Sequence, residues 1–431
     1  MKRTLTILLR LLSLATKLGL TLYMGRYFTL EDMGLYGLVF GAVTILGGAF
    51  GLEIDYVVGR ELVTASPLRR AVKIRDQSLF LFLNWLGFGL VTLIVCLFYN
   101  FELPLAILLF IFAIAALESA ASMFHADMTA MGNPYLANLH FFIRAGSWVF
   151  PVVALGFLDP VFRNTHLVLV LWTGGLLAAL CCGAFWWRKL PWRRLKRIKI
   201  QWRWLFRGLR QSFGIWCGTM GLALGVYADR FVIAKFLSVD EVAIVTFYAS
   251  FALAMLTLVQ NGMLSFSYPE MIRLFAHHAH KDFWQRVKIT FVQVFLFAAA
   301  IALCLAVCVP VLGWFMGKDA FNSQLPTLFL MLFAMWLRSV AETFYFVLYA
   351  QNQDRPLWLG NLLFLIPALG CNLIFVPLFG FIGIGFSALA GSVFLLIWRL
   401  VFTWRTFKKP PRVTQDTKKE VKLSKRLSFS E

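Results

Sequence analysis

The chain has 431 residues, enough for two or three soluble domains, but its composition excludes a soluble fold. Hydrophobic residues make up 60% of it and charged residues only 14%, whereas a soluble domain carries about 25% charged residues to meet water. The 41 Lys and Arg exceed the 21 Asp and Glu, as expected for basic cytoplasmic loops facing anionic membrane lipids. No soluble basic module stands outside the apolar segments, so we expect no nucleic-acid partner.

Twelve apolar segments have the length of about 20 residues that a membrane-spanning helix needs. They predict an all-α, polytopic membrane protein, with spans at 5–24, 34–58, 77–99, 104–124, 136–158, 165–187, 211–235, 241–264, 289–316, 325–350, 356–378 and 382–404. Connections rich in Lys and Arg alternate with connections that carry at most one base. Twelve spans bring the basic connections and both termini to one side, which the positive-inside rule makes cytoplasmic.

A repeated sequence divides the chain into two halves. GRYFTLEDMGLY at 25–36 and AKFLSVDEVAIV at 234–245 match in residue class, and each joins the first span of its half to the second. Six spans separate the copies, so both halves enter the membrane from the same side and form parallel six-helix bundles around a central cavity. The expected organisation is a bundle at 1–187, a basic cytoplasmic linker at 188–210, a bundle at 211–407 and a basic cytoplasmic tail at 408–431.

Four stretches carry a resemblance to a known family. They are GRYFTLEDMGLYGL at 25–38, YADRFVIAKFLSVDEVAIVTFY at 227–248, LYAQNQDRP at 348–356 and PLFGFIGIGFSALA at 377–390. The chain resembles the polysaccharide transporter family of the multidrug/oligosaccharidyl-lipid/polysaccharide exporter superfamily. The resemblance implies a flippase of the bacterial inner membrane that moves an undecaprenyl-diphosphate-linked oligosaccharide, such as an O-antigen, capsule or exopolysaccharide repeat unit. It also implies a glycan polymerase and glycosyltransferases as partners.

Ionisable side chains at membrane depth are costly, and they usually face a cavity or an opposite charge. A diphosphate headgroup needs basic partners, so we expect a cationic, substrate-binding cavity formed by Arg144, Lys17, Arg10, Arg230 and Arg338. Two alternatives stay open. Arg10 lies near the membrane surface and can reach lipid headgroups, and Arg144 can form a structural ion pair with Glu118.

The acidic residues are candidates for coupling to H⁺ or Na⁺. These candidates are Asp229, Glu53 and Asp55. Adjacent helical residues point about 100° apart, so we expect Asp229 and Arg230 to have different partners. Arg338 and Glu342 have the spacing of an intrahelical ion pair. We find no cofactor motif, metal-ligand motif, catalytic constellation or nucleotide-binding loop, so we expect a transporter and not an enzyme.

Two other functions remain open. A cation-coupled multidrug or metabolite exporter of the same superfamily would prefer an acidic cavity. A membrane scaffold for glycosyltransferases would dock partners through the basic, Trp-rich segment 186–210, for which anchoring at the membrane interface is the simpler interpretation.

Overall fold

The computed structural model describes residues 2–98 and 104–408, and all regular secondary structure in these ranges is helical. The first half contains α1 (Lys2–Tyr27), α2 (Leu30–Gly51), α3 (Ile54–Thr64), α4 (Pro67–Phe98), α5 (Leu105–Ala130), α6 (Pro134–Phe142), the π-turn η1 (Ile143–Ser147), α7 (Val149–Leu158), the short η2 (Pro160–Phe162) and α8 (Thr165–Trp187). The basic tail expected at 408–431 lies outside the described residues, apart from Lys408.

The short 3₁₀ turn η3 (Trp192–Arg197) leads into the second half. This half contains α9 (Trp202–Tyr227), α10 (Asp229–Phe236), α11 (Val239–Val259), η4 (Gln260–Leu264), α12 (Ser265–Ala276), α13 (His280–Phe315), α14 (Ala320–Ser323), α15 (Leu325–Ala350), α16 (Asp354–Leu363), η5 (Ile366–Gly370), α17 (Cys371–Phe379) and α18 (Ile382–Lys408). Within the described residues, each of the twelve predicted spans is helical for most of its length, and span 34–58 is interrupted between α2 and α3. Ten helical stretches are long and apolar enough to cross a membrane by length and composition, and α1 and α4 correspond to the other two spans.

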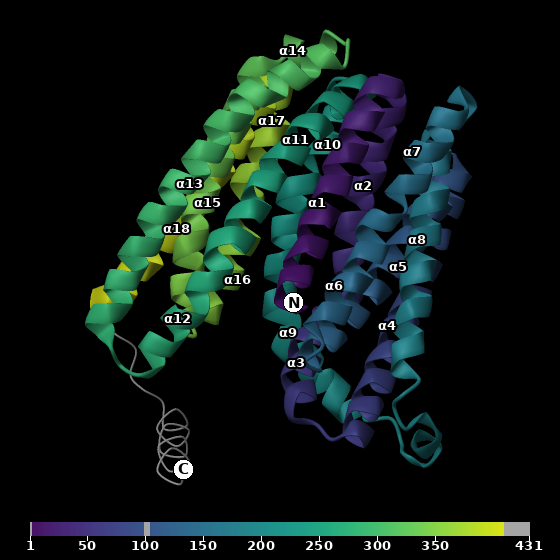
Figure 1. Ribbon diagram of the computed structural model, residues 1–431, viewed down its shortest axis with the longest axis vertical. Helices are drawn as coiled ribbons and strands as arrows, with labels where there is room; N and C mark the ends of the chain where they lie inside the picture. Colours follow the sequence, from purple (N-terminus) through teal and green to yellow (C-terminus); the bar gives the residue numbers. More distant parts are fainter. Residues whose placement is uncertain (1, 99–103, 409–431) are drawn as a thin grey trace.

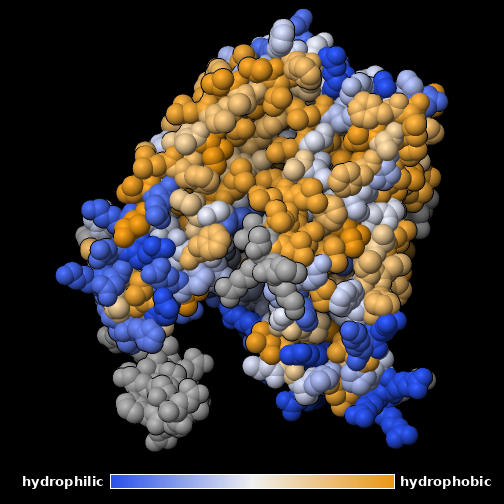
Figure 2. Space-filling view, in the orientation of Figure 1, coloured by the Kyte–Doolittle hydropathy of each residue, from blue (hydrophilic) through white to orange (hydrophobic). Residues whose placement is uncertain are grey.

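The two halves form two bundles that diverge from one end of the molecule to the other (Figure 1). The turn from α3 to α4 and the turn from α12 to α13 lie at the lower end in this view, where the basic connections gather, and α14 lies at the upper end. Figure 2 shows hydrophobic residues across the middle of the visible face and hydrophilic residues gathered at the lower end. This distribution is the one that a lipid bilayer requires.

The repeated sequence folds into the same local structure in both halves. Thr29 accepts a hydrogen bond from the backbone N–H of Asp32 at the start of α2, over 3.1 Å. Ser238 accepts one from the backbone N–H of Glu241 at the start of α11, over 3.2 Å. A hydroxyl at the N-cap with an acid three residues later is a capping arrangement that fixes where a helix begins. The two copies therefore start equivalent helices, and α2 and α11 pack against each other.

The linker between the bundles is shorter than expected and is attached to the first bundle. Helix α9 begins at Trp202, inside the segment 188–210 that the sequence predicts to be a connection. Arg75 of α4 donates to the carbonyl oxygen of Ile198 over 2.8 Å, and Asp76 accepts from the backbone N–H of Gln201 over 3.0 Å. These bonds hold the linker against α4, so they explain its ordered path without a docked protein.

Candidate functional site

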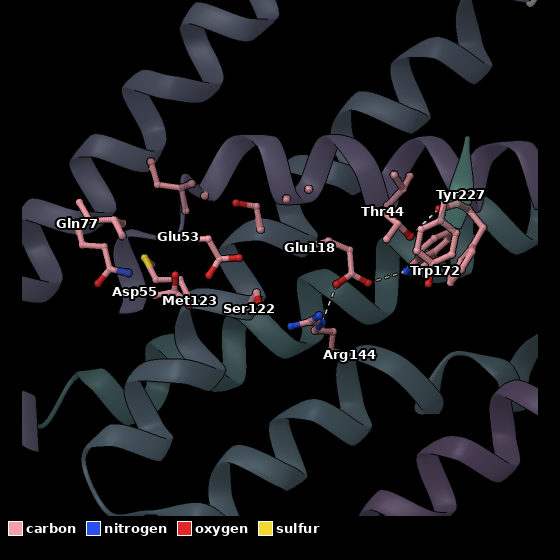
Figure 3. A pocket seen from close by; sticks show the side chains of 18 of the residues that line it. Thr44, Glu53, Asp55, Gln77, Glu118, Ser122, Met123, Arg144, Trp172 and Tyr227 are labelled. Carbon is pink, nitrogen blue, oxygen red and sulfur yellow. Dashed lines mark hydrogen bonds and ion pairs between the residues drawn. The ribbon is translucent and has the colours of Figure 1, made fainter. Parts of the chain in front are cut away.

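A cavity of about 340 Å³ lies in the first bundle and is closed on one side by Tyr227 of α9 (Figure 3). Its polar and charged lining residues are Lys17, Thr44, Glu53, Asp55, Gln77, Glu118, Ser119, Ser122, Arg144 and Tyr227. They come from α1, α2, α3, α4, α5, η1 and α9, together with the α2–α3 turn, so the cavity exists only once these helices are packed. Its volume falls within the range of about 300–1,000 Å³ that is usual for ligand pockets.

Glu118 organises the first charged group in this cavity. Its carboxylate accepts from Arg144 Nε over 2.6 Å and from the indole N–H of Trp172 over 3.2 Å, as Figure 3 shows. The ion pair that the sequence left as an alternative for Arg144 is thus present. Arg144 lies in η1, and π-turns within helices are frequent at functional sites because they redirect side chains.

Lys17 faces the same cavity from α1, and its side chain is exposed there. Its ammonium lies 6.0 Å from the centre of the Phe40 ring and within electrostatic range of Glu118 and Arg144. No ion pair of Lys17 occurs among the residues that the structure describes. Lys17 and Arg144 together with Glu118 give this part of the cavity a net positive charge.

Glu53 and Asp55 form a second, acidic part of the cavity. Glu53 lies in the break between α2 and α3, and Asp55 follows it in the first turn of α3. Leu52 and Glu53, the two residues of the break, both have positive φ, 46° and 52°. Non-glycine residues rarely adopt this conformation, and such strain is often stored at functional sites. The break turns the chain so that both carboxylates line the cavity. The sequence suggested these acids but gave no sign that Gly51-Leu52-Glu53 would interrupt the helix.

Arg10 does not line this cavity, contrary to the sequence-based expectation. Its Nε donates to Asn138 of α6 over 2.6 Å, and its Nη1 approaches Asn261 of η4 at 3.4 Å. Asn138 belongs to the first bundle and Asn261 to the second. Arg10 therefore bridges the two bundles. Contact with lipid headgroups, the alternative weighed for Arg10, stays a prediction.

Arg230 is also outside this cavity, and its expected separation from Asp229 is wrong. Arg230 is 2% exposed, and its Nη1 lies 3.1 Å from the Asp229 carboxylate. The helix restarts between α9 and α10, with Asp229 as the first residue of α10, so its carboxylate also accepts from the backbone N–H of Arg230. This local geometry lets two adjacent residues pair, which an uninterrupted helix would not favour.

Arg338 lies in the second bundle, and the predicted pair between Arg338 and Glu342 does not form. Glu342 instead accepts from Arg399 of α18 over 2.7 Å. Arg338 lines a smaller cavity of about 60 Å³ together with Asp229, Asn372, Ser387 and Ser392. Packing of α15 against α18 supplies a partner from another helix, and this cross-helix contact replaces the local i,i+4 pair. Only two of the five predicted cavity bases, Lys17 and Arg144, therefore line the cavity that contains Glu118.

The bundles are sealed against each other at the end away from the basic connections. A side chain at Gly34 would collide with Val239, and one at Gly37 would collide with Thr246, so α2 and α11 approach closely. Near this seam, Arg26 donates to the carbonyl oxygen of Phe315 over 2.9 Å, and Lys318 donates to that of Phe28. Both bonds join the first bundle to the second.

At the opposite end the bundles are less closely packed. A cavity of about 440 Å³ lies there between α3, α9 and α16. It is lined by Tyr56, Val57, Arg60, Glu61, Gln211, Gly214, Ile215, Asp354 and Trp358. The molecule is thus closed at one end and open at the other.

No family model matches the chain, and no curated protein matches it. Solved structures do match over almost the whole length. An inward-facing multidrug resistance MATE family transporter of the MOP superfamily gives a TM-score of 0.71 at 12% identity, covering 93% of this chain and 96% of that one. The lipid II flippase MurJ, in an inward closed conformation, gives 0.66 at 12% identity, covering 95% and 94%. The chain has the fold of these transporters.

A third solved structure also matches over almost the whole chain. It is an outward-facing multidrug resistance MATE family transporter, 15% identical, with a TM-score of 0.54. The match covers 95% of this chain and 96% of that transporter. The score is lower than the 0.71 of the inward-facing structure.

Proposed function

We propose that this chain is a flippase of the MOP superfamily that moves an anionic, lipid-linked oligosaccharide across the bacterial inner membrane by alternating access. The observation that carries the proposal is Lys17 beside the Arg144–Glu118 pair inside the cavity of a transporter fold. Lys17 is free of ion pairs among the described residues and offers its charge to a diphosphate. Arg144 can exchange Glu118 for phosphate because its guanidinium binds both kinds of oxyanion.

The open and sealed ends supply the direction of movement. We place the basic connections and both termini in the cytoplasm, since the positive-inside rule requires it. The substrate then enters from the cytoplasmic side, and its headgroup reaches Lys17 and Arg144. Opening of the α2–α11 seam, with approach of α3 to α16 at the other end, releases the substrate on the other side. The lipid tail stays in the bilayer throughout, so only the polar headgroup crosses inside the protein.

A cation-coupled exporter is the second candidate, and the acidic part of the cavity favours it. Glu53 and Asp55 would attract an organic cation, whereas Lys17 and Arg144 would repel it. For coupling, Asp229 remains a proposed H⁺ or Na⁺ site beside the small cavity of the second bundle. In either case we expect no resident cofactor.

The test measures transport by the wild type and by variants of Lys17 and Arg144, each purified and reconstituted in lipid vesicles. The probe is undecaprenyl diphosphate carrying one sugar, and its translocation is measured by access of an impermeant reagent to that sugar. We expect Lys17→Ala and Arg144→Ala to lose most of the activity, and Arg144→Lys to keep part of it, because it retains the charge but not the bidentate geometry. As a matched control, Arg286→Ala removes an ion pair with Glu270 (2.9 Å) that lies outside the cavity, and it should transport normally.

The double variant Glu118→Gln/Arg144→Ala separates substrate contact from simple charge balance. If Arg144 only neutralises Glu118, removing both charges should restore activity, because no unpaired buried charge remains. Restoration would contradict the role of Arg144 in substrate binding. Export of an organic cation that increases in Lys17→Ala, with no movement of the lipid probe in any variant, would favour the exporter instead.

A further inference from the structure

Asp127 is an acidic residue that neither the sequence analysis nor the proposed transport cycle uses. It lies one turn from the end of α5 and is 0% exposed. Neither of its carboxylate oxygens has a hydrogen-bond partner among the residues that the structure describes. An ionised carboxylate in this position would lack both water and a counter-charge, which costs several kcal/mol. A protonated carboxyl avoids that cost because it is neutral.

Asp127 forms no ion pair with any residue that the structure describes. Asp55 of α3 is the charged group whose field reaches Asp127, and it has the same sign. The helices packed against α5 are α2, α3, α4, α6 and α8. The Arg and Lys side chains toward this end pair with other groups: Arg60 with Tyr56, Lys73 with Glu61, Arg75 with Asp76, and Arg144 of η1 with Glu118. His140 of α6 stacks on Phe124, and its ring nitrogens make no hydrogen bond among the described residues.

Asp127 is connected to the transport cavity by its place on the helix. Ser119, Met123 and Asp127 follow one another at steps of four and share a face of α5. Ser119 and Met123 line the cavity that contains Lys17 and Arg144, and Asp55 lines the same cavity from α3. Asp127 thus lies on the same face of α5 as two residues that line the cavity, but beyond the cavity itself, whereas Asp55 lines it.

We propose that Asp127 and Asp55 form a proton-binding pair at the edge of the cavity, with the proton held on Asp127 in this conformation. A hydronium ion in the cavity transfers a proton to the Asp127 carboxylate and becomes water as the O–H bond forms on Asp127. When the site opens to the other side, that O–H bond breaks and the proton passes to a water molecule there, which becomes hydronium. A proton fits better than a metal ion, because the described residues contain no group of three acidic, His or Cys side chains that could hold one. The role in coupling rests on the proposed transport function, whereas proton binding does not.

Infrared spectroscopy of the purified, reconstituted protein tests proton binding without any substrate. A protonated carboxyl has a carbonyl stretch that carboxylates lack. We expect the wild type to show this band near neutral pH, Asp127→Asn to lose it and Asp127→Glu to shift it. Asp76→Asn is the matched control, because Asp76 is also 0% exposed but is hydrogen-bonded to Arg75 and to the backbone N–H of Gln201.

The band should weaken as the pH rises, by about tenfold per pH unit above the midpoint, and Asp55→Asn should move that midpoint downward, because a neighbouring negative charge favours the protonated form of Asp127. An Asp127→Asn spectrum identical to that of the wild type would overturn the inference, as would loss of the band in Asp76→Asn instead. If Asp127 behaves as expected but the lipid probe does not move, the proposed function fails and proton binding stands. If the probe moves equally well in Asp127→Asn under every imposed pH gradient, the coupling role is wrong.

Discussion

Glu342 is the acid around which the buried charges of the second bundle are arranged. It accepts from Arg399 over 2.7 Å and lies 3.4 Å from the side-chain amide nitrogen of Gln260, while Arg399 also donates to Asn361 over 3.2 Å. The side chains of Arg399 and Glu342 are only 3% and 9% exposed. Such a pair is sensitive to loss of one partner, because the remaining charge is left buried without compensation.

We therefore expect Glu342→Gln to lower the free energy of unfolding by about 3–5 kcal/mol, the usual cost of an orphaned buried charge. Glu342→Gln/Arg399→Gln should recover most of that loss. Thermal unfolding in detergent measures the loss in the single variant and the recovery in the double variant. Glu270→Gln, in the more exposed pair with Arg286, serves as a control and should change stability by less than about 1 kcal/mol. Equal stability of Glu342→Gln and the wild type would contradict a structural role for this pair.

At the scale of helices, small residues decide how closely the two bundles approach. Gly34 and Gly37 of α2 face Val239 and Thr246 of α11 at a distance that leaves no room for a side chain. Small residues at a helix interface allow close backbone packing in membranes. Because the repeated sequence starts both helices at equivalent points, the seam lies where the two halves of the molecule meet.

Gly37→Val should weaken the seam and favour the conformation open at that end. Overpacking costs about 1–3 kcal/mol, so the population of the open form should rise by roughly tenfold. An impermeant thiol reagent applied from the sealed side would measure this through a cysteine introduced at Ser250. Gly174→Val is the control, since nothing lies within 4 Å of a side chain added there. Unchanged labelling in Gly37→Val would show that the seam does not govern opening.

The whole molecule has an orientation in the membrane that the distribution of charge predicts. We expect an impermeant thiol reagent outside the cell to label a cysteine at Ser323 but not one at Arg194, in a background without the seven native cysteines. Both positions are exposed in the structure, so burial cannot cause the difference. The opposite labelling pattern would reverse the orientation and place the open end of this conformation outside the cytoplasm.

The sequence by itself determined the fold class and the number of spans, because lipid demands long apolar helices and the alternation of basic loops restricts their order. It also located the equivalent connections before α2 and α11, in which Thr29 and Ser238, each followed by an acid three residues later, cap the two helices. Periods, lengths and caps are properties of neighbouring residues, so they can be read along the chain.

Only the tertiary structure decided which charges meet. Glu342 pairs with Arg399 of another helix, Arg10 bridges the bundles, and Asp127 is left without a partner. The break at Leu52 and Glu53, which turns two acids into the cavity, was equally invisible in the sequence. Partners on different helices are set by packing and by local departures from helical geometry, and neither leaves a fixed spacing in the sequence.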